Sequence, residues 1–546
     1  MRKLVILIAA LALTAAAWAQ GDAVRTLTLL TRPQTVAPDE FQAAQLVAQQ
    51  WRQLGLDVEV RVTPWEQLAD LVWFNRADWD MTMWRMVGRA ERSDPDELIF
   101  NLYHSSTADK GYNFIGYINP EYDALVEAQR TETDPVARQK LIFQAQEILS
   151  RDQPEAFLVY PLSTYAFRSD IWDAATVVDQ NGIGIKNFWT YTGITPLTEQ
   201  KDLVLNFPDV VQAINPFYIS GAVDSWITEL IWDRLLRIGP DGLPQPWAAE
   251  SFSWVDETTI DVTLRSGMKW HDGLPVTAED VVFSFRAPAG DEVPMYKPFV
   301  TNIDDIEILD ENTVRFHLAE PSAAFLTSTL AKVNLVPLHI WGPILDDLAN
   351  KPDENAEDIQ EEVPIGSGPF KFSSWRRTQE VVLEANPDHF AAPKIDRWIL
   401  RIVPNTEASL GMLRSGEINF LSDYKGDPQV LLQTAESNPI KVVSSADIGF
   451  NYIAFNNRRP PFDDVAFRRA LSLAIDRDFI AKAAYKGYGV PANSPISVAL
   501  NYWNDPRVDE LGSGLELAKS ILEEAGYTVD RGKLHYPEGV VESLGN

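Results

Sequence analysis

The histidine, serine and acidic residues of this 546-residue chain show no spacing typical of a hydrolase or a metal site. The six histidines include no H-E-x-x-H pair, and no G-x-S-x-G turn could carry a nucleophilic serine. His271-Asp272-Gly273 has the composition of a turn. Acidic pairs such as Asp94 and Asp96 are expected by chance among 78 acidic residues. We therefore expect no catalytic residue, no metal and no cofactor. A secreted hydrolase remains the alternative to the non-enzymatic function predicted at the end of this subsection.

The first residues have the composition of a secretory signal. Arg2 and Lys3 precede an apolar run from 4 to 16, and Ala17-Trp18-Ala19 is a typical cleavage site. The run is too short to cross a bilayer. The chain has no cysteine, which excludes disulfides and a lipidated cysteine anchor. These features predict a signal peptide over 1–19 and a periplasmic or otherwise extracytoplasmic protein that is neither a lipoprotein nor membrane-inserted.

Composition restricts the partners of the chain. Its formal charge is −31, with 47 basic and 78 acidic residues, which disfavours nucleic acid and anionic lipid surfaces. Seventeen tryptophans allow stacking on sugars or apolar ligands, although most must belong to the core. The length predicts about three domains of ordinary size.

Helical and alternating patterns indicate a mixed α/β fold. Apolar residues recur at helical spacing over 39–54, Gly55 supplies a stop, and apolar and charged residues alternate over 56–62. With a strand at 26–30, this predicts a parallel β-α-β unit. Further helices are predicted at 120–130, 134–150, 464–474 and 476–484. Short β segments such as 259–264 and 313–318 indicate an inserted β-rich domain.

The stretch from Trp247 to Phe285 resembles the signature of family 5 extracytoplasmic solute-binding proteins, the peptide-binding type of ABC importer subunit. The segments 364–370, 456–464 and 468–477 resemble three further motifs of that family. The resemblance implies a two-lobed periplasmic-binding-protein type II-like fold with an extra inserted domain. It also implies that solute is enclosed between the lobes.

The order of the motifs is similar to a circular permutation of the family order. The family continuation expected after 534 is found instead at 26–62, and the family's first mature strand corresponds to 203–207. Permutation is tolerated when the parental ends lie close together and the new break falls in an exposed loop. We therefore expect both chain ends to lie in one lobe, and 192–201 to be a linker between the parental ends.

The predicted division of the chain follows from this order. After the signal peptide, residues 24–165 and 461–546 form lobe 2, residues 166–247 and 364–460 form lobe 1, and residues 248–363 form the inserted domain attached to lobe 1.

The resemblance also suggests where ligand binds. In peptide-binding relatives an aspartate near 83–96 holds the peptide α-ammonium; here Glu91 is nearest to that place, and the match departs from the family pattern. Arginines in this segment could bind a carboxylate or sugar hydroxyls, or pair with Glu91 or Asp94. The candidate ligand-binding residues are Trp84, Arg85, Arg89, Glu91, Asp94, Tyr112, Asn113, Asn215, Phe217, Tyr218 and Tyr452.

The prediction from sequence is therefore a monomeric solute receptor for an ABC transporter permease. Oligopeptide is the first expected ligand class and oligosaccharide the second.

Overall fold

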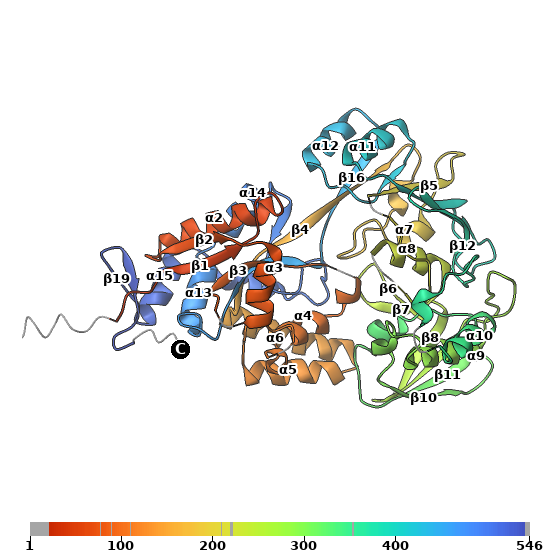
Figure 1. Cartoon of the computed structure of the whole chain (residues 1–546), viewed down its shortest axis with the longest axis horizontal. Coiled ribbons are helices and arrows are strands. Elements are labelled where there is room, and N and C mark those ends of the chain that lie inside the picture. The colour runs from red at the N-terminus through yellow and green to blue at the C-terminus, as the bar shows by residue number, and fades with distance from the viewer. Residues whose placement is uncertain are drawn as a thin grey trace, which may run out of the picture.

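The structure, a computed structural model, describes residues 21–540 except 77, 89, 110, 209, 219–221 and 352–353, so the predicted signal peptide lies outside the described residues. Two lobes lie side by side (Figure 1). Lobe 2 contains both described chain ends, and lobe 1 carries the β-rich inserted domain. The mixed α/β fold predicted from the sequence is confirmed.

One mixed sheet of 12 strands runs through both lobes. Its lobe 2 part contains, in order, β2 (Val58–Val62), β1 (Leu27–Thr31), β3 (Met81–Met86), β17 (Phe450–Phe455) and the first half of β4 (Glu155–Arg168). Its lobe 1 part continues through β15 (Phe420–Leu421), β5 (Asp202–Phe207), β14 (Arg397–Ile402), β13 (Glu380–Ala385) and β12 (Phe370–Arg376). Two further strands, β16 (Ile440–Ala446) and β18 (Gly489–Pro491), pair with β4.

The predicted β-α-β unit is confirmed by the parallel register of β1 and β2, in which Leu27 lies opposite Val58. Between them, α2 (Pro38–Arg52) buries its apolar stripe against the sheet. The helix is followed by Gly55, whose φ of 86° is strained for residues with a side chain. Trp51 is fully buried and donates its indole N–H to the Leu471 carbonyl at 2.8 Å.

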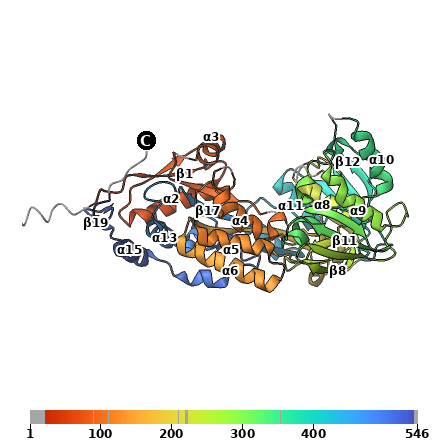
Figure 2. The same cartoon turned by 90° about the horizontal axis from the view of Figure 1, so that it is seen from below.

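Polar side chains begin the other predicted helices of lobe 2. Asn119 caps α5 (Pro120–Thr131), Asp134 caps α6 (Pro135–Asp152) and Asp476 caps α14 (Arg477–Ala483), each by accepting a backbone N–H. The lobe also contains α3 (Trp65–Ala69), the π-helical turn η1 (Asp70–Asn75), α4 (Asp96–Tyr103), α13 (Val465–Leu473) and α15 (Leu515–Glu524). Figure 2 shows α5 and α6 on one side of this lobe and α3 projecting from the other.

The inserted domain and two of the lobe 1 helices share one continuous apolar core, and the other two helices of the lobe pack on a smaller separate cluster. Its helices are α7 (Phe188–Gly193), α8 (Ala222–Ile231), α11 (Thr406–Ser415) and α12 (Pro428–Glu436). The inserted domain is a four-stranded antiparallel sheet in the order β10 (Ile303–Ile308), β11 (Thr313–Leu318), β9 (Thr259–Leu264) and β8 (Ala249–Asp256), with α9 (Ala278–Arg286) and α10 (Leu338–Leu348). A small hairpin of β6 (Leu236–Ile238) and β7 (Pro244–Pro246) also lies in lobe 1. A second small hairpin, β19 (Thr528–Asp530) with β20 (Lys533–His535), lies in lobe 2.

The first and last described segments lie against each other in lobe 2. Ala23 pairs with His535 in an antiparallel bridge, and the Val24 N–H donates to the Leu534 carbonyl at 2.9 Å. The Tyr536 N–H donates to the Asp22 carbonyl at 2.9 Å. The sequence-based expectation that both ends share one lobe therefore holds for the described residues.

This geometry predicts that the chain tolerates relocated ends. A variant that joins Val540 directly to Gly21 and begins at Thr198, in the exposed 197–201 loop, is expected to fold with an unchanged circular dichroism spectrum and cooperative unfolding. A matched variant opened between Ala44 and Gln45, inside the buried face of α2, is expected not to fold. Failure of the first variant to fold would remove the structural basis of the permutation hypothesis.

Candidate functional site

Two segments cross between the lobes. The continuous strand β4 pairs with β17 through its first half and with β16 through its second half. The second crossing is the β16–β17 connection at 447–449, which packs tightly on the end of β3: a Cβ added to Gly449 would lie 2.2 Å from the Met86 carbonyl oxygen. The lobe boundary drawn at 460/461 from the sequence therefore moves to this connection, because β17 forms ladders with β3 and β4 inside lobe 2.

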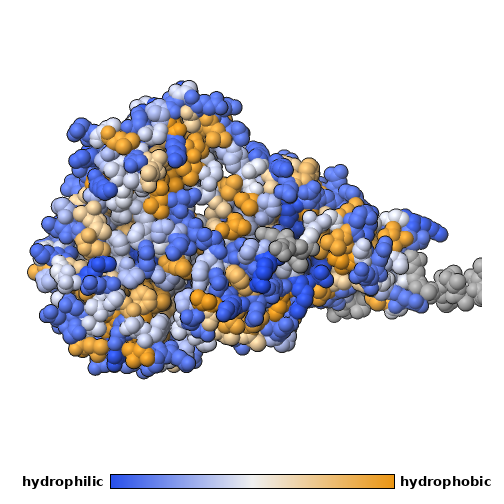
Figure 3. All heavy atoms as spheres, turned by 180° about the vertical axis from the view of Figure 1, so that it is seen from behind, coloured by the Kyte–Doolittle hydropathy of each residue, from blue (hydrophilic) through white to orange (hydrophobic). Residues whose placement is uncertain are grey.

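The carboxyl edges of the parallel strands in both lobes point towards these crossings. In lobe 2, the C-terminal end of β3 lies beside the start of β17, where Met86 pairs with Phe450. In lobe 1, β15 runs parallel to β5 and advances along β4 from Phe167 to Ala166, towards the crossing. Ligands of open α/β sheets bind outside the carboxyl ends of the strands. Figure 3 shows a hollow between the lobes, with apolar side chains beside it.

Several exposed apolar side chains lie at the lobe 2 edge. Val62 is the last residue of β2, Val36, Trp65 and Val87 lie in the segments after β1, β2 and β3, and Phe74 and Tyr112 are further exposed apolar side chains of lobe 2. Phe74 is 75% exposed, Trp65 52% and Tyr112 51%. Contiguous exposed apolar surface on a soluble protein marks interaction or ligand sites. The edge is therefore suited to bind apolar or stacking groups.

Trp84 lies at the centre of an aromatic cluster below this surface. Its ring centroid is 5.1 Å from that of Trp65, 5.2 Å from Phe114 and 6.4 Å from Trp73, to which it is nearly parallel. Tyr112 meets Trp73 edge-on at 5.3 Å. Trp84 and Tyr112 were predicted from the resemblance, whereas Trp65 and Trp73 were missed, because only the turn through η1 brings them next to β3.

The lobe 1 edge carries a cation among aromatic rings. Lys186, between β4 and α7 in the chain, places its Nζ 4.9 Å from the Trp226 ring centroid and 5.7 Å from that of Tyr165. Trp226 in turn meets Phe207, the last residue of β5, at 5.5 Å. Burial lowers the pKa of Lys186, and the charge of Asp423 partly opposes this shift.

Arg85 joins lobe 2 to the hinge. Its guanidinium lies 3.8 Å from the carboxylate of Asp447, and the side chain is half-exposed. Asp447 also accepts the Gly449 N–H at 2.9 Å. This contact leaves guanidinium donors of Arg85 exposed at the crossing.

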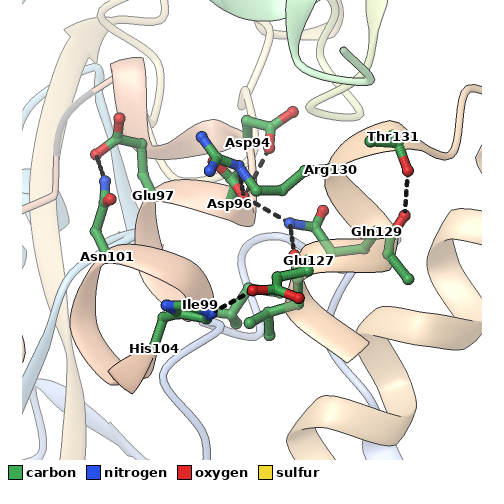
Figure 4. A network of polar contacts seen from close by, with 12 residues as sticks. Asp94, Asp96, Glu97, Ile99, Asn101, His104, Glu127, Gln129, Arg130 and Thr131 are labelled. Atoms are coloured by element: carbon green, nitrogen blue, oxygen red, sulfur yellow. Dashed lines mark hydrogen bonds and ion pairs between the residues drawn. The ribbon is translucent and has the colours of Figure 1, made fainter. Parts of the chain in front are cut away.

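Asp94 is buried and bound to protein groups. Arg138 donates to both of its carboxylate oxygens, at 2.7 and 2.9 Å, and Thr327 of the inserted domain donates at 3.0 Å. Burial favours the protonated carboxyl, but the Arg138 charge and hydrogen bonds outweigh it and hold the pKa of Asp94 below its usual value. Next to it, Asp96 accepts from Gln129 at 2.6 Å and pairs with Arg130 at 3.3 Å (Figure 4). In this structure Asp94 therefore joins α6 to the inserted domain.

Four other predicted side chains are buried in the interior. The Asn113 amide donates to the carbonyls of Tyr103, His104 and Tyr117, and accepts the Tyr117 N–H. Asn215 donates to two carbonyls of the inserted domain. Phe217 packs against Trp341 at 5.0 Å, and Tyr452 against Phe450 at 5.1 Å. These contacts stabilise the fold and leave the four side chains away from the exposed edges.

The remaining predicted residues are described in part. Tyr218 is half-buried, and its N–H reaches the Asn215 carbonyl at 3.5 Å. Arg89 and the side chain of Glu91 lie outside the described residues, so the departure from the family pattern around 83–96 stays a prediction.

The described residues offer no group of three or more metal-binding side chains, and none of the described helices is long and apolar enough to cross a membrane. A separate hollow of about 200 Å³ lies on lobe 1 near His271 and His389. Both rings are committed there: His271 contacts the Gly368 carbonyl and accepts the Gly366 N–H, while His389 contacts Asp233. This hollow lies beyond the end of the antiparallel strand β13 and not at the carboxyl edges of the parallel strands.

A two-lobed α/β fold with two crossings and facing strand ends is the architecture of binding proteins that close around a ligand at a hinge. The family model for bacterial extracellular solute-binding proteins, family 5 (middle), matches residues 8–110 and 244–543. The chain belongs to this family.

The matches to two characterised relatives each cover 60% of the chain. It is 33% identical over 340 residues to the oligopeptide-binding protein AppA of Bacillus subtilis (strain 168), a match that covers 60% of this chain and 59% of AppA. It is 26% identical over 354 residues to the dipeptide-binding protein of Escherichia coli (strain K12), covering 60% of this chain and 64% of the relative. Each match therefore spans less than two thirds of the relative's length.

Among solved structures, the ABC transporter substrate-binding protein CtaP of Listeria monocytogenes is similar with a TM-score of 0.50 and 27% sequence identity. The match covers 61% of this chain and 66% of CtaP.

Proposed function

We propose that this protein is the extracytoplasmic receptor of an ABC importer and encloses an oligopeptide between its two lobes. The observation that supports this most is the facing pair of carboxyl edges at the hinge, with an exposed aromatic surface on lobe 2 and a cation on lobe 1. Clefts of this kind combine apolar walls with a few polar groups that orient the ligand.

The crossings allow the lobes to close. Hinge motions concentrate in a few residues that absorb the backbone change, and here the two crossings are the middle of β4 and the 447–449 connection. On closure, the aromatic edge of lobe 2 covers the ligand while lobe 1 supplies polar contacts. The closed form docks on a membrane permease, and the receptor acts as a monomer.

Oligosaccharide is the second ligand class, because exposed indole and phenol rings also stack on sugars. The outer rings of the cluster, Trp65 and Tyr112, are both half-exposed at the edge.

The test is native mass spectrometry of protein purified without refolding from a periplasmic extract, followed by release of the bound molecule. An intact peptide supports the proposal, and an oligosaccharide assigns the second class. Recovery of cleavage products, or turnover of an added peptide, would instead favour the secreted hydrolase. Protein that binds neither class would contradict the proposed function.

Trp65 should contribute to affinity without contributing to stability. Trp65→Ala is expected to weaken ligand binding by tenfold or more, a loss of about 1.4 kcal/mol, because buried aromatic anchors dominate binding interfaces. Its unfolding temperature should change little, since the side chain is half-exposed. Phe479→Ala on α14, where the ring is 47% exposed but far from both strand edges, is the matched control and should bind normally. Equal affinities of the two variants in titration calorimetry would exclude Trp65 from the site.

A further inference from the structure

The ammonium group of Lys186 has no anionic partner among the residues that the structure describes. No ion pair or hydrogen bond of its Nζ is found among the described residues; its contacts are the rings of Trp226 and Tyr165. Asp423 and Asp447 influence it only through space, and Asp423 forms its ion pair with Lys425 instead, at 3.1 Å. A cation removed from water without a carboxylate is unfavourable unless something else binds it.

Local contacts hold the backbone on both sides of Lys186 and the Tyr165 ring beside it. The Tyr165 hydroxyl donates to the Ile183 carbonyl at 3.1 Å, and a Cβ added to Gly184 would lie 2.3 Å from the Tyr165 ring. On the other side, Asn187 caps α7 by accepting the Thr190 N–H at 2.8 Å. The backbone that carries Lys186 and one of the two rings that its ammonium group contacts are thus in place before any ligand arrives, which reduces the entropy lost on binding.

Lys186 also lies at the lobe 1 edge that faces the hinge. Tyr165 belongs to the crossing strand β4, Trp226 lies on α8, and Trp226 contacts Phe207 at the carboxyl end of β5. The side chain is partly exposed, so a ligand group can reach it. Across the hinge lies the aromatic edge of lobe 2, whose exposed side chains are mainly apolar.

We propose that Lys186 anchors a carboxylate of the ligand that binds between the lobes. The proposal rests on the proposed receptor function and specifies it: the ligand bears an anionic carboxylate at one end and an apolar or stacking body at the other. Trp226 and Tyr165 would flank the resulting ion pair, and their rings exclude water and strengthen it. The carboxylate could be the C-terminus of a peptide or the acid group of a uronic sugar.

The experiment compares matched pools of probes on the full mature protein by competitive native mass spectrometry. The peptide pool contains di- to hexapeptides without aspartate or glutamate, as free acids and as C-terminal amides. The sugar pool contains oligouronates and neutral oligosaccharides of the same lengths. Wild-type protein is expected to prefer the carboxylate form of one pool by about tenfold to a hundredfold, the range of a hydrogen bond to a charged group.

Two variants, each of which lacks one lysine charge, test whether Lys186 causes the preference for the carboxylate form. Lys186→Met should reduce the preference to about one, whereas Lys441→Met, an exposed lysine of β16 in the same lobe, should keep the wild-type preference. Lys186→Met should also unfold at a temperature no lower than wild type, because it removes an unpaired, desolvated charge; this result separates loss of binding from loss of folding.

The outcomes are distinct. Preference for free-acid peptides identifies a peptide C-terminus, and preference for uronates identifies an acidic sugar; either supports the site if Lys186→Met abolishes it. If wild-type protein binds the probes with a carboxylate preference near one, the proposed Lys186 site is wrong. The site is also wrong if the preference survives in Lys186→Met. Neither result contradicts the receptor function. If wild-type protein binds neither pool, both the Lys186 site and the proposed receptor function are wrong.

Discussion

Replacing Arg138 with methionine is expected to lower the free energy of unfolding by about 3–5 kcal/mol, because the Asp94 carboxylate then stays buried without its cation. Arg138 is 5% exposed and donates to both Asp94 oxygens. Its guanidinium also donates to Gln129 at 2.9 and 3.0 Å and lies 5.2 Å from the Trp503 ring centroid. Urea denaturation monitored by circular dichroism measures the change.

The double variant Arg138→Met/Asp94→Asn separates the buried charge from lost packing. Asparagine keeps an oxygen that can accept the Asp96 N–H, which donates to Asp94 at 2.9 Å. We expect the double variant to be more stable than Arg138→Met alone, since no charge is then left unpaired in the interior. If the second substitution gives no recovery, the loss arises from packing rather than from the carboxylate.

Arg151 on the same helix is the matched control. It is half-exposed, and its partners are the carboxylates of Asp152 and Glu121. Arg151→Met should cost at most about 1 kcal/mol, the usual range for exposed ion pairs. A loss of less than about 1 kcal/mol for Arg138→Met as well would contradict the structural role assigned to Asp94.

The contact around Asp94 also bears on the relation of the lobes. Thr327 and Ala323 of the inserted domain hydrogen bond to Asp94 and to the Arg130 carbonyl, at 3.0 and 2.7 Å. These two bonds bridge lobe 2 and the domain attached to lobe 1. Weakening the Asp94 network therefore loosens an interlobe contact as well as a buried ion pair.

Local signals were enough to predict much of the fold. The apolar stripe of α2 and the helices predicted at 120–130, 134–150 and 476–484 depend on residues within a few positions of each other, and the structure confirms them. Parallel pairing of β1 and β2 was predicted from the helix between them. The boundary between lobes could not be obtained in this way, because the position of β17 depends on a ladder with β3, more than 350 residues away in the chain.

The candidate site was less predictable, because burial and partners decide which polar residues are free. Asn113 has the side chain of a ligand contact, but its amide is occupied by backbone carbonyls that only the folded chain brings near. Lys186 belongs to no recognisable sequence motif. It became a candidate only in the structure, where its Nζ contacts two aromatic rings and forms no ion pair with a described residue. Trp84 was a candidate because of the resemblance, and the structure places it in β3 at the centre of the aromatic cluster.

Glu155, the first residue of β4, should make stability depend on pH in the neutral range. Its side chain is 3% exposed, and burial raises the pKa of its carboxyl to about 8, partly opposed by the hydrogen bond that Tyr103 donates. In the unfolded chain the same group ionises near its ordinary value of about 4.3. Between these values the folded protein holds a proton that the unfolded chain has released.

The sign follows from this difference in bound protons. A raised carboxyl pKa gives stability that is fully present below the unfolded pKa and is lost as pH rises towards 8, at up to about 1.4 kcal/mol per pH unit. Glu155→Gln cannot ionise and keeps an oxygen for the Tyr103 hydroxyl. We therefore expect the variant to resemble wild type near pH 4.5 and to become progressively more stable than wild type up to pH 8.

The measurement is the free energy of unfolding of both proteins in urea at half-unit steps from pH 4.5 to 9. Glu59→Gln, on the exposed face of β2, is the matched control, and its difference from wild type should not change with pH. A constant difference between Glu155→Gln and wild type would mean that Glu155 is ionised in the folded protein throughout the range. The predicted slope instead means that the first residue of β4 buries a neutral carboxyl in the lobe 2 core, where ionisation opposes folding.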